Sequence, residues 1–189
     1  PDACRKYLGA KVASQVFDKY DLAPVRAETG VAESFLKADK ISSITQKIDP
    51  LDLVKQVSGN YEIDLKNPAL ESIGHHLAAR GKIDGKQLAS KFSADPYGWS
   101  TDTLRYLIAA MLRAGKLSLK IGGNEFTTVG EHAIEGLRNN NSFKKVIVGL
   151  RDNPPDNERL ALAANRLTEL TGTQVIPLEE EISKAALKY

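Results

Sequence analysis

Seven polar side chains between residues 101 and 124 have the chemistry of a DNA contact. Arginine and lysine side chains bind phosphates, whereas threonine and asparagine side chains donate hydrogen bonds to the DNA backbone or to base edges. We expect the first four on the exposed side of a helix and the last three on a hairpin that follows it. The candidate DNA-contacting residues are Thr101, Thr103, Arg105, Arg113, Lys116, Lys120 and Asn124.

The same helix carries little that could read a base sequence. Its two basic residues, Arg105 and Arg113, are accompanied by Asp102, and much of its remaining surface is apolar. Asparagine and glutamine, the side chains that most often bind adenine, are missing from it. This composition fits weak, shape-driven contact with double-stranded DNA and protein–protein docking about equally well.

Three predicted helices position these side chains. Each has a start signal, which is either a proline suited to a first helical position or a side chain that accepts hydrogen bonds from free backbone N–H groups. Gly81 and Gly115 follow the last turns of the first and third helices, where glycine is favoured. The start signals are Pro68, Asp84 with Gln87 in capping-box spacing, and Ser100 or Thr101.

A β-hairpin is predicted directly after the third helix. Apolar and polar residues alternate on both sides of a turn at Gly122-Gly123-Asn124. Three helices followed by a hairpin are the order of a winged helix-turn-helix, in which a short strand, here Lys82-Ile83, pairs with the hairpin. We therefore predict such a domain over residues 67–128, the alternative being an unrelated helical bundle with one hairpin.

Helical segments are predicted on both sides of this domain. In residues 1–66, Leu8, Val12, Val16 and Tyr20 indicate one helix, a second surrounds Phe35, and Asp49-Pro50 starts a third that ends near Gly59. Residues 61–65 alternate as a short strand. Residues 129–189 contain a helix, a strand near 143–148, a linker at 152–155 and two further helices. The fold class is therefore mainly α (α+β), with segments 1–66, 67–128 and 129–189.

The sequence shows no catalytic, cofactor or metal motif. Gly81-Lys82 lacks the upstream glycine and the following hydroxyl of a phosphate-binding loop. His75 and His76 are adjacent, so on a helix they point about 100° apart and cannot bind one ion together. Glu179, Glu180 and Glu181 stand in a first helical turn, which favours a solvated face. We expect a non-catalytic protein without cofactor or metal.

Two aromatic residues, Tyr97 and Trp99, stand in the turn before the third helix. They could stack on a base, on an arginine or on a partner protein, or they could hold the turn against the core. The second interpretation is favoured for Trp99, the single tryptophan of the chain.

Charge and composition restrict the classes of partner and the cellular compartment that the sequence favours. The 189 residues carry a net charge of +2, and 42% are apolar, which is enough for a packed core. Residues 68–128 carry eight basic and five acidic side chains, so the middle third is the basic part. No apolar run approaches the length of a membrane span and no secretory signal is present. A single cysteine, Cys4, favours a reducing cytoplasm.

The turn and the third helix resemble a known family. The similarity rests on the stretch Asp95-Pro96-Tyr97-Gly98-Trp99-Ser100-Thr101-Asp102 and on the helix after it, which leads through Ala114-Gly115-Lys116-Leu117 into a hairpin. It is a similarity to the BrxC and PglY group. These are very large P-loop proteins of the BREX and Pgl phage-defence systems of bacteria. The similarity is firm over residues 84–121, and Phe17 to Arg26 is also similar. The resemblance implies an internal fragment of an ATPase whose nucleotide site lies in another region.

Two functions remain open at this stage. The first is a winged-helix module that contacts double-stranded DNA within a larger phage-defence ATPase. The second is a docking module in which the same surface holds another subunit or domain of the defence complex, without direct DNA contact. Exposure of Arg105, Arg113, Lys116 and Lys120 on one concave or grooved face would favour DNA, whereas burial of the third helix under residues 1–67 or 129–189 would favour a structural role.

Overall fold

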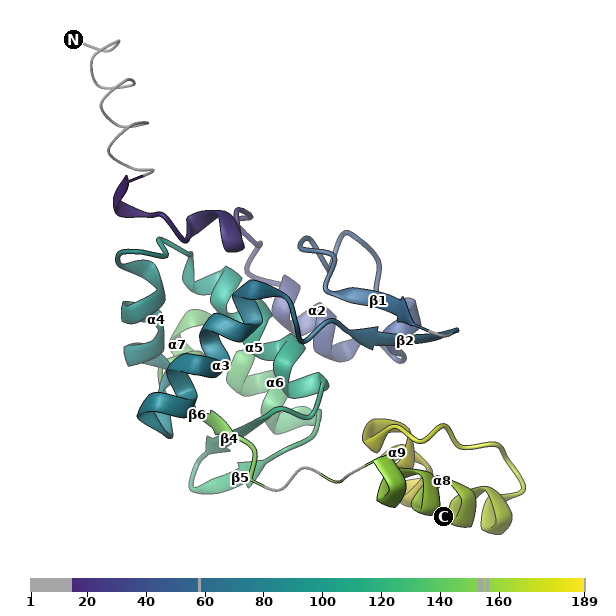
Figure 1. Ribbon diagram of the computed structural model, residues 1–189. Coiled ribbons are helices and arrows are strands. Elements are labelled where there is room, and N and C mark those ends of the chain that lie inside the picture. Colours follow the sequence, from purple (N-terminus) through teal and green to yellow (C-terminus); the bar gives the residue numbers. More distant parts are fainter. Residues whose placement is uncertain (1–14, 58, 153–154, 156, 189) are drawn as a thin grey trace, which may run out of the picture.

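The computed structural model of the chain describes residues 15–57, 59–152, 155 and 157–188 (Figure 1). Cys4, Leu8 and Val12 lie outside the described residues. The helices are α2 (Val31–Lys37), α3 (Pro68–Arg80), α4 (Gly85–Ser93), α5 (Thr101–Arg113), α6 (Glu131–Leu137), α7 (Asn140–Phe143), α8 (Asn157–Thr171) and α9 (Glu179–Lys188), with short 3-10 helices at Tyr20–Leu22 and Ile41–Ser43. The strands are β1 (Val54–Val57), β2 (Asn60–Ile63), β3 (Ile83–Asp84), β4 (Leu117–Ile121), β5 (Asn124–Phe126) and β6 (Ile147–Leu150).

The predicted order of three helices and a hairpin is confirmed. The Asn67 side chain accepts from the N–H of Ala69 at the start of α3. Asp84 caps α4 by accepting from the N–H of Gln87 at 2.8 Å. Ser100 caps α5, β4 and β5 form the hairpin, and the fold is α+β with a winged-helix unit.

The sheet of this unit contains a strand from beyond the hairpin. Its order is β3-β6-β4-β5, so β6 lies between β3 and the hairpin. Val148 faces Ile83 on one side and Leu119 on the other, and all three are buried. The predicted pairing of Lys82-Ile83 with the hairpin is therefore wrong, because β6 takes that place. The boundary predicted at residue 128 would cut through this sheet.

Helix α5 is the central element of the core. Every residue from Thr103 to Arg113 is buried. Its sequence is apolar on nearly all sides, which is the pattern of a helix surrounded by other elements. Figure 1 shows it among α2, α3, α4, α6 and α7, and its most extensive helix contact is with α2.

The helix predicted after Asp49-Pro50 is absent, and a hairpin takes its place. The Asp49 carboxylate accepts from the N–H of Leu53 at 3.0 Å and of Val54 at 2.8 Å, so it does cap a segment, but that segment is a turn. The chain then enters β1, which pairs antiparallel with β2. The strand predicted at residues 61–65 thus exists, and its partner is the segment predicted to be helical.

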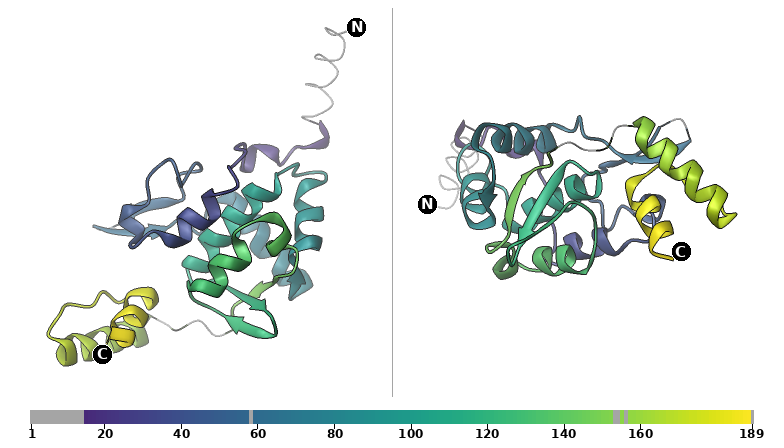
Figure 2. Two further views of the ribbon diagram at one scale, coloured as in Figure 1. Left: turned by 180° about the vertical axis from the view of Figure 1, so that it is seen from behind. Right: turned by 90° about the horizontal axis from the view of Figure 1, so that it is seen from below.

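Helices α8 and α9 form a hairpin that follows the segment after β6 (Figure 2). Arg151 links this pair to the sheet, because both terminal nitrogens of its guanidinium donate to the carboxylate of Glu179, one of them at 2.7 Å. The ammonium of Lys184 donates to the carbonyl of Asp39. Among the described residues, no helix has the length and apolar character of a membrane span.

Candidate nucleic-acid interface

Three of the seven candidate DNA contacts are inside the protein. Thr103 and Arg105 are 0% exposed and Arg113 is 7% exposed. The expectation that they face solvent on α5 is wrong. Helices α3 and α4 cover one side of α5. Its other side is covered by α2, by the segment before α2 and by α7.

The guanidinium of Arg105 binds four groups from separate parts of the chain. Its Nε donates to Oδ1 of Asn140 at 2.8 Å and its Nη1 to the carbonyl of Leu137. Its Nη2 donates to the carbonyl of Thr29 at 3.0 Å and to the Asp102 carboxylate. A buried charge is tolerated only when its donors are satisfied in this way. Arg105 is therefore a structural cation that joins three segments.

Arg113, at the C-terminal end of α5, also donates to backbone carbonyls of another segment. Its Nη1 donates to the carbonyl of Phe35 at 2.6 Å and its Nη2 to the carbonyl of Ala38 at 2.6 Å. These carbonyls belong to the last turn of α2 and its C-cap, which lack partners within the helix. A cation at a helix C-terminus also interacts favourably with the helix dipole. Arg113 thus fixes the end of α2 on α5.

Thr103 completes the contact between α5 and the preceding segment. Its Oγ1 donates to the carbonyl of Val25 at 2.7 Å and accepts from the N–H of Ala27 at 3.2 Å. Together, Thr103, Arg105 and Arg113 bind backbone groups of residues 25–38. The polar side of α5 is occupied by the chain itself.

The other four candidates do not form one surface. Thr101 is half-buried at the start of α5, while Lys116, Lys120 and Asn124 lie beyond its other end. Since α5 has 13 residues, these two positions are separated by about 20 Å of helix. Lys116 lines a cavity of about 570 Å³ between the end of α5 and the α8–α9 hairpin. Lys120 and Asn124 are exposed on the hairpin.

The hairpin carries one compensating carboxylate, that of Glu125. Lys120 pairs across the strands with Glu125, and the ammonium of Lys82 lies 2.9 Å from Oε1 of Glu125. Hydrogen bonds from Ser118 and Lys82 hold the pKa of Glu125 below its ordinary value, with a smaller contribution from Lys120. The carboxylate is therefore ionised near neutral pH and offsets the positive charge of the β4–β5 hairpin.

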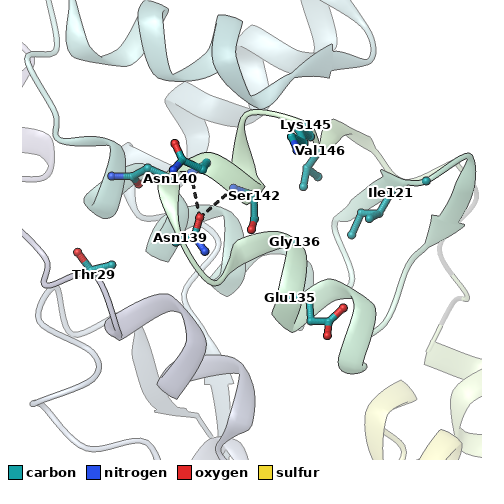
Figure 3. Close-up of a pocket in the computed structure, with 11 residues that line it drawn as sticks. Thr29, Ile121, Glu135, Gly136, Asn139, Asn140, Ser142, Lys145 and Val146 are labelled. Carbon is teal, nitrogen blue, oxygen red and sulfur yellow. Dashed lines mark hydrogen bonds between the residues drawn. The ribbon is translucent and has the colours of Figure 1, made fainter.

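A shallow polar pocket of about 640 Å³ lies between α6, α7 and the hairpin tip (Figure 3). Asn139 caps α7 by accepting from the N–H groups of Asn141 and Ser142. Asn140, which also lines the pocket, accepts from Arg105. Its charged lining residues are one cation, Lys145, and one carboxylate, Glu135. These polar groups mostly serve the local fold, and the pocket offers no charged cluster for a ligand.

The turn before α5 holds the N-terminal segment against the core. Trp99 is 2% exposed and stacks on Phe92, with ring centroids 5.2 Å apart. Its Nε1 donates to the carbonyl of Tyr20 at 3.3 Å. The favoured interpretation of Trp99 as a residue that fixes this turn is confirmed.

The sequence interpretation missed the exposed cations of α3 and α4. Lys86, Gln87, Ser90 and Lys91 form the solvent face of α4, and Arg80 is exposed in the last turn of α3. A signal was available, because Leu88 and Phe92 fix the buried side of α4 and so place both lysines outside. These residues supply much of the positive charge of the middle third.

Residues 40–152 match the model of one protein family, the BREX ATP-binding protein BrxC winged helix-turn-helix domain. This match covers more than half of the chain. The chain belongs to this family. The expected resemblance to the BrxC group is confirmed, and so is the winged-helix fold. No curated protein and no solved structure matches the chain.

The matched range begins before β1 and ends just after β6, so it includes the inserted strand. Within the described residues, no group of three or more His, Cys, Asp or Glu side chains could hold a metal ion. Because of the family match, the chain contains a winged-helix module of a phage-defence protein, and modules of this kind are generally non-catalytic.

Proposed function

We propose that this winged-helix module serves as a docking module of the BREX ATPase and that α5 is its internal anchor. The surface of α5 that would enter a DNA groove holds residues 25–38 in place. The anchor fixes the direction in which the chain enters the module, and β6 and Arg151 fix the direction in which it leaves. Other subunits or domains of the defence complex would then be held at defined positions.

The single observation that supports this function best is the burial of Arg105 and Arg113. Both donate to backbone carbonyls of segments outside the three-helix unit, at Thr29, Phe35 and Ala38. An arginine that contacts phosphate must be reachable by DNA, whereas these two are covered. Their hydrogen bonds favour the docking function over DNA contact by the third helix.

Hydrogen exchange on the full chain tests this proposal. Arg113→Gln removes the donors to the C-terminal carbonyls of α2, so amides of Val31–Lys37 should exchange faster while β1 and β2 remain protected. Arg138→Gln is the matched control, because exposed Arg138 contacts the same helix through an ion pair with Glu33, at 3.7 Å. Equal exchange in both variants would contradict the anchor function.

The same proposal predicts the behaviour of the α5 candidate residues toward DNA. Thr101→Ala should leave the affinity for a generic duplex unchanged, and Arg105→Lys should alter it only where it also lowers the melting temperature. Fluorescence anisotropy and a thermal melt on the same samples provide the comparison. A loss of DNA affinity without any loss of stability in Arg105→Lys would instead favour a DNA-reading helix.

A further inference from the structure

The outer face of α4 carries two exposed lysines and no carboxylate. Its exposed residues are Lys86, Gln87, Ser90, Lys91 and Ser93. Within the residues that the structure describes, neither lysine forms an ion pair. Gln87 and Ser90 add side chains that can donate hydrogen bonds. This face offers cations and donors to solvent.

Further cations extend the face at both ends. At the N-terminal end, the N–H of Gly85 donates to the carbonyl of Val146 at 2.8 Å, which places the backbone of residues 144–145, both exposed, beside the first turn of α4. At the other end, the His76 ring packs edge-on against Phe92 with centroids 5.7 Å apart. Arg80 follows His76 by one turn of α3, and Lys91 directly precedes Phe92 on α4, so both cations flank this contact in the sequence.

We propose that the basic face, defined as Arg80, Lys86, Lys91, Lys144 and Lys145, binds the phosphate backbone of double-stranded DNA. Lys86 and Lys91 are five positions apart on one helix, which is about 7.5 Å along its axis. Along the duplex axis, one strand carries a phosphate about every 3.4 Å, so two lysines on neighbouring turns of α4 can reach different phosphates. In helix-turn-helix proteins the helix before the recognition helix crosses the DNA backbone, and α4 has this position.

The surface chemistry favours DNA over a protein partner. Interfaces between proteins need a desolvated apolar centre. The exposed large hydrophobic side chains among the described residues lie in residues 16–61 and 162–187, and none lies between these two ranges. The basic face therefore lacks the apolar centre of a protein interface, whereas phosphate contacts require only cations and donors. This inference goes beyond the docking function and does not depend on it.

The test compares two double charge reversals in the full chain. Lys86→Glu with Lys91→Glu should weaken binding to a random-sequence duplex about tenfold or more at about 50 mM salt, and should reduce the slope of log affinity against log salt by about two. Lys116→Glu with Lys120→Glu is the matched control, because it changes net charge by the same amount on the hairpin. All four side chains are exposed, so melting temperatures should stay close to that of the parent chain.

Three outcomes would overturn the proposal. They are equal losses in the two double variants, a larger loss in the hairpin variant, and no duplex binding by the parent chain at low salt. A fourth outcome, tighter binding of poly-glutamate than of the duplex at equal charge concentration, would assign the face to acidic proteins instead. The exchange experiment on α2 is independent of all these results, so the two proposals can fail separately.

Discussion

The Nε of Arg105 lies 2.8 Å from Oδ1 of Asn140, and this hydrogen bond joins the middle of α5 to the short helix α7. The same guanidinium binds the carbonyl of Thr29 in the segment before α2. One buried side chain thus connects chain segments that lie far apart in the sequence on either side of α5. Its position in the core, rather than any contact with DNA, accounts for an arginine in this apolar helix.

Arg105→Met should lower the free energy of unfolding by about 3–5 kcal/mol, because it leaves several buried acceptors and the Asp102 carboxylate without their donor. Urea denaturation measures the change. Asp102→Asn should cost less, since the amide oxygen can still accept from Arg105. An unchanged midpoint in Arg105→Met would mean that the network contributes no net stability.

Gly85→Ala should destabilise the contact between α4 and α7. A Cβ at this position would lie 2.1 Å from the carbonyl oxygen of Phe143, which is a backbone atom that cannot move alone. We expect a loss of about 1–3 kcal/mol, as for other overpacked sites. Gly74→Ala is the control: its Cβ would meet only Met111 at 3.9 Å, and alanine within helix α3 should stabilise by about 0.4–1 kcal/mol. Equal effects in the two variants would argue against close packing at Gly85.

Trp99 gives a direct spectroscopic test of the turn before α5. As the single tryptophan, buried on Phe92, it should emit at shorter wavelength in the native chain and shift to longer wavelength on unfolding. Trp99→Ala should cost about 3–5 kcal/mol, whereas Trp99→Phe keeps an aromatic ring and should cost less. Native emission typical of a solvated indole would contradict the buried position.

His76 should make stability depend on pH. Burial, with smaller contributions from Lys91 and Arg80, lowers its pKa below the ordinary 6.5, so the folded chain binds fewer protons than the unfolded chain in this range. The contribution of His76 to the free energy of unfolding is therefore fully present above pH 6.5 and is lost as the pH decreases through and below that value. Urea midpoints at about pH 7.5 and about pH 5.5 should differ less in His76→Gln than in the parent chain. His75→Gln, at an exposed neighbouring position, should keep the parental difference.

Local signals predicted the helices and the hairpin of the winged-helix unit well. Pro68, Asp84 and Ser100 act through backbone groups within three residues, so their effect is visible in the sequence. The signal at Asp49-Pro50 is of the same kind, yet the outcome differs. Asp49 caps a turn, and the segment after this turn forms strand β1 because it pairs with β2. A cap predicts where a backbone N–H is satisfied and leaves the following structure open.

The expected exposure of three candidate residues is wrong for a different reason. Polar residues on a helix usually face solvent, which is the basis for expecting Thr103, Arg105 and Arg113 there, yet all three are buried. Their acceptors lie at Val25, Thr29 and Phe35, far away in the sequence, so no local pattern reveals the burial. The nearly continuous apolar surface of α5 is the feature that could have indicated a helix covered on all sides.

The place of β6 between β3 and β4 also determines when the sheet can form during synthesis. Helices α3 and α4 and the β4–β5 hairpin use neighbouring residues and can form as the chain leaves the ribosome. The central strand is made last, and until it arrives β3 and β4 each present an unpaired edge. Closure of the sheet then requires contacts between residues distant in sequence, which form slowly. The winged-helix unit therefore becomes complete only after Leu150 has been synthesised, and a chain that stops at the hairpin would keep both edges open to aggregation.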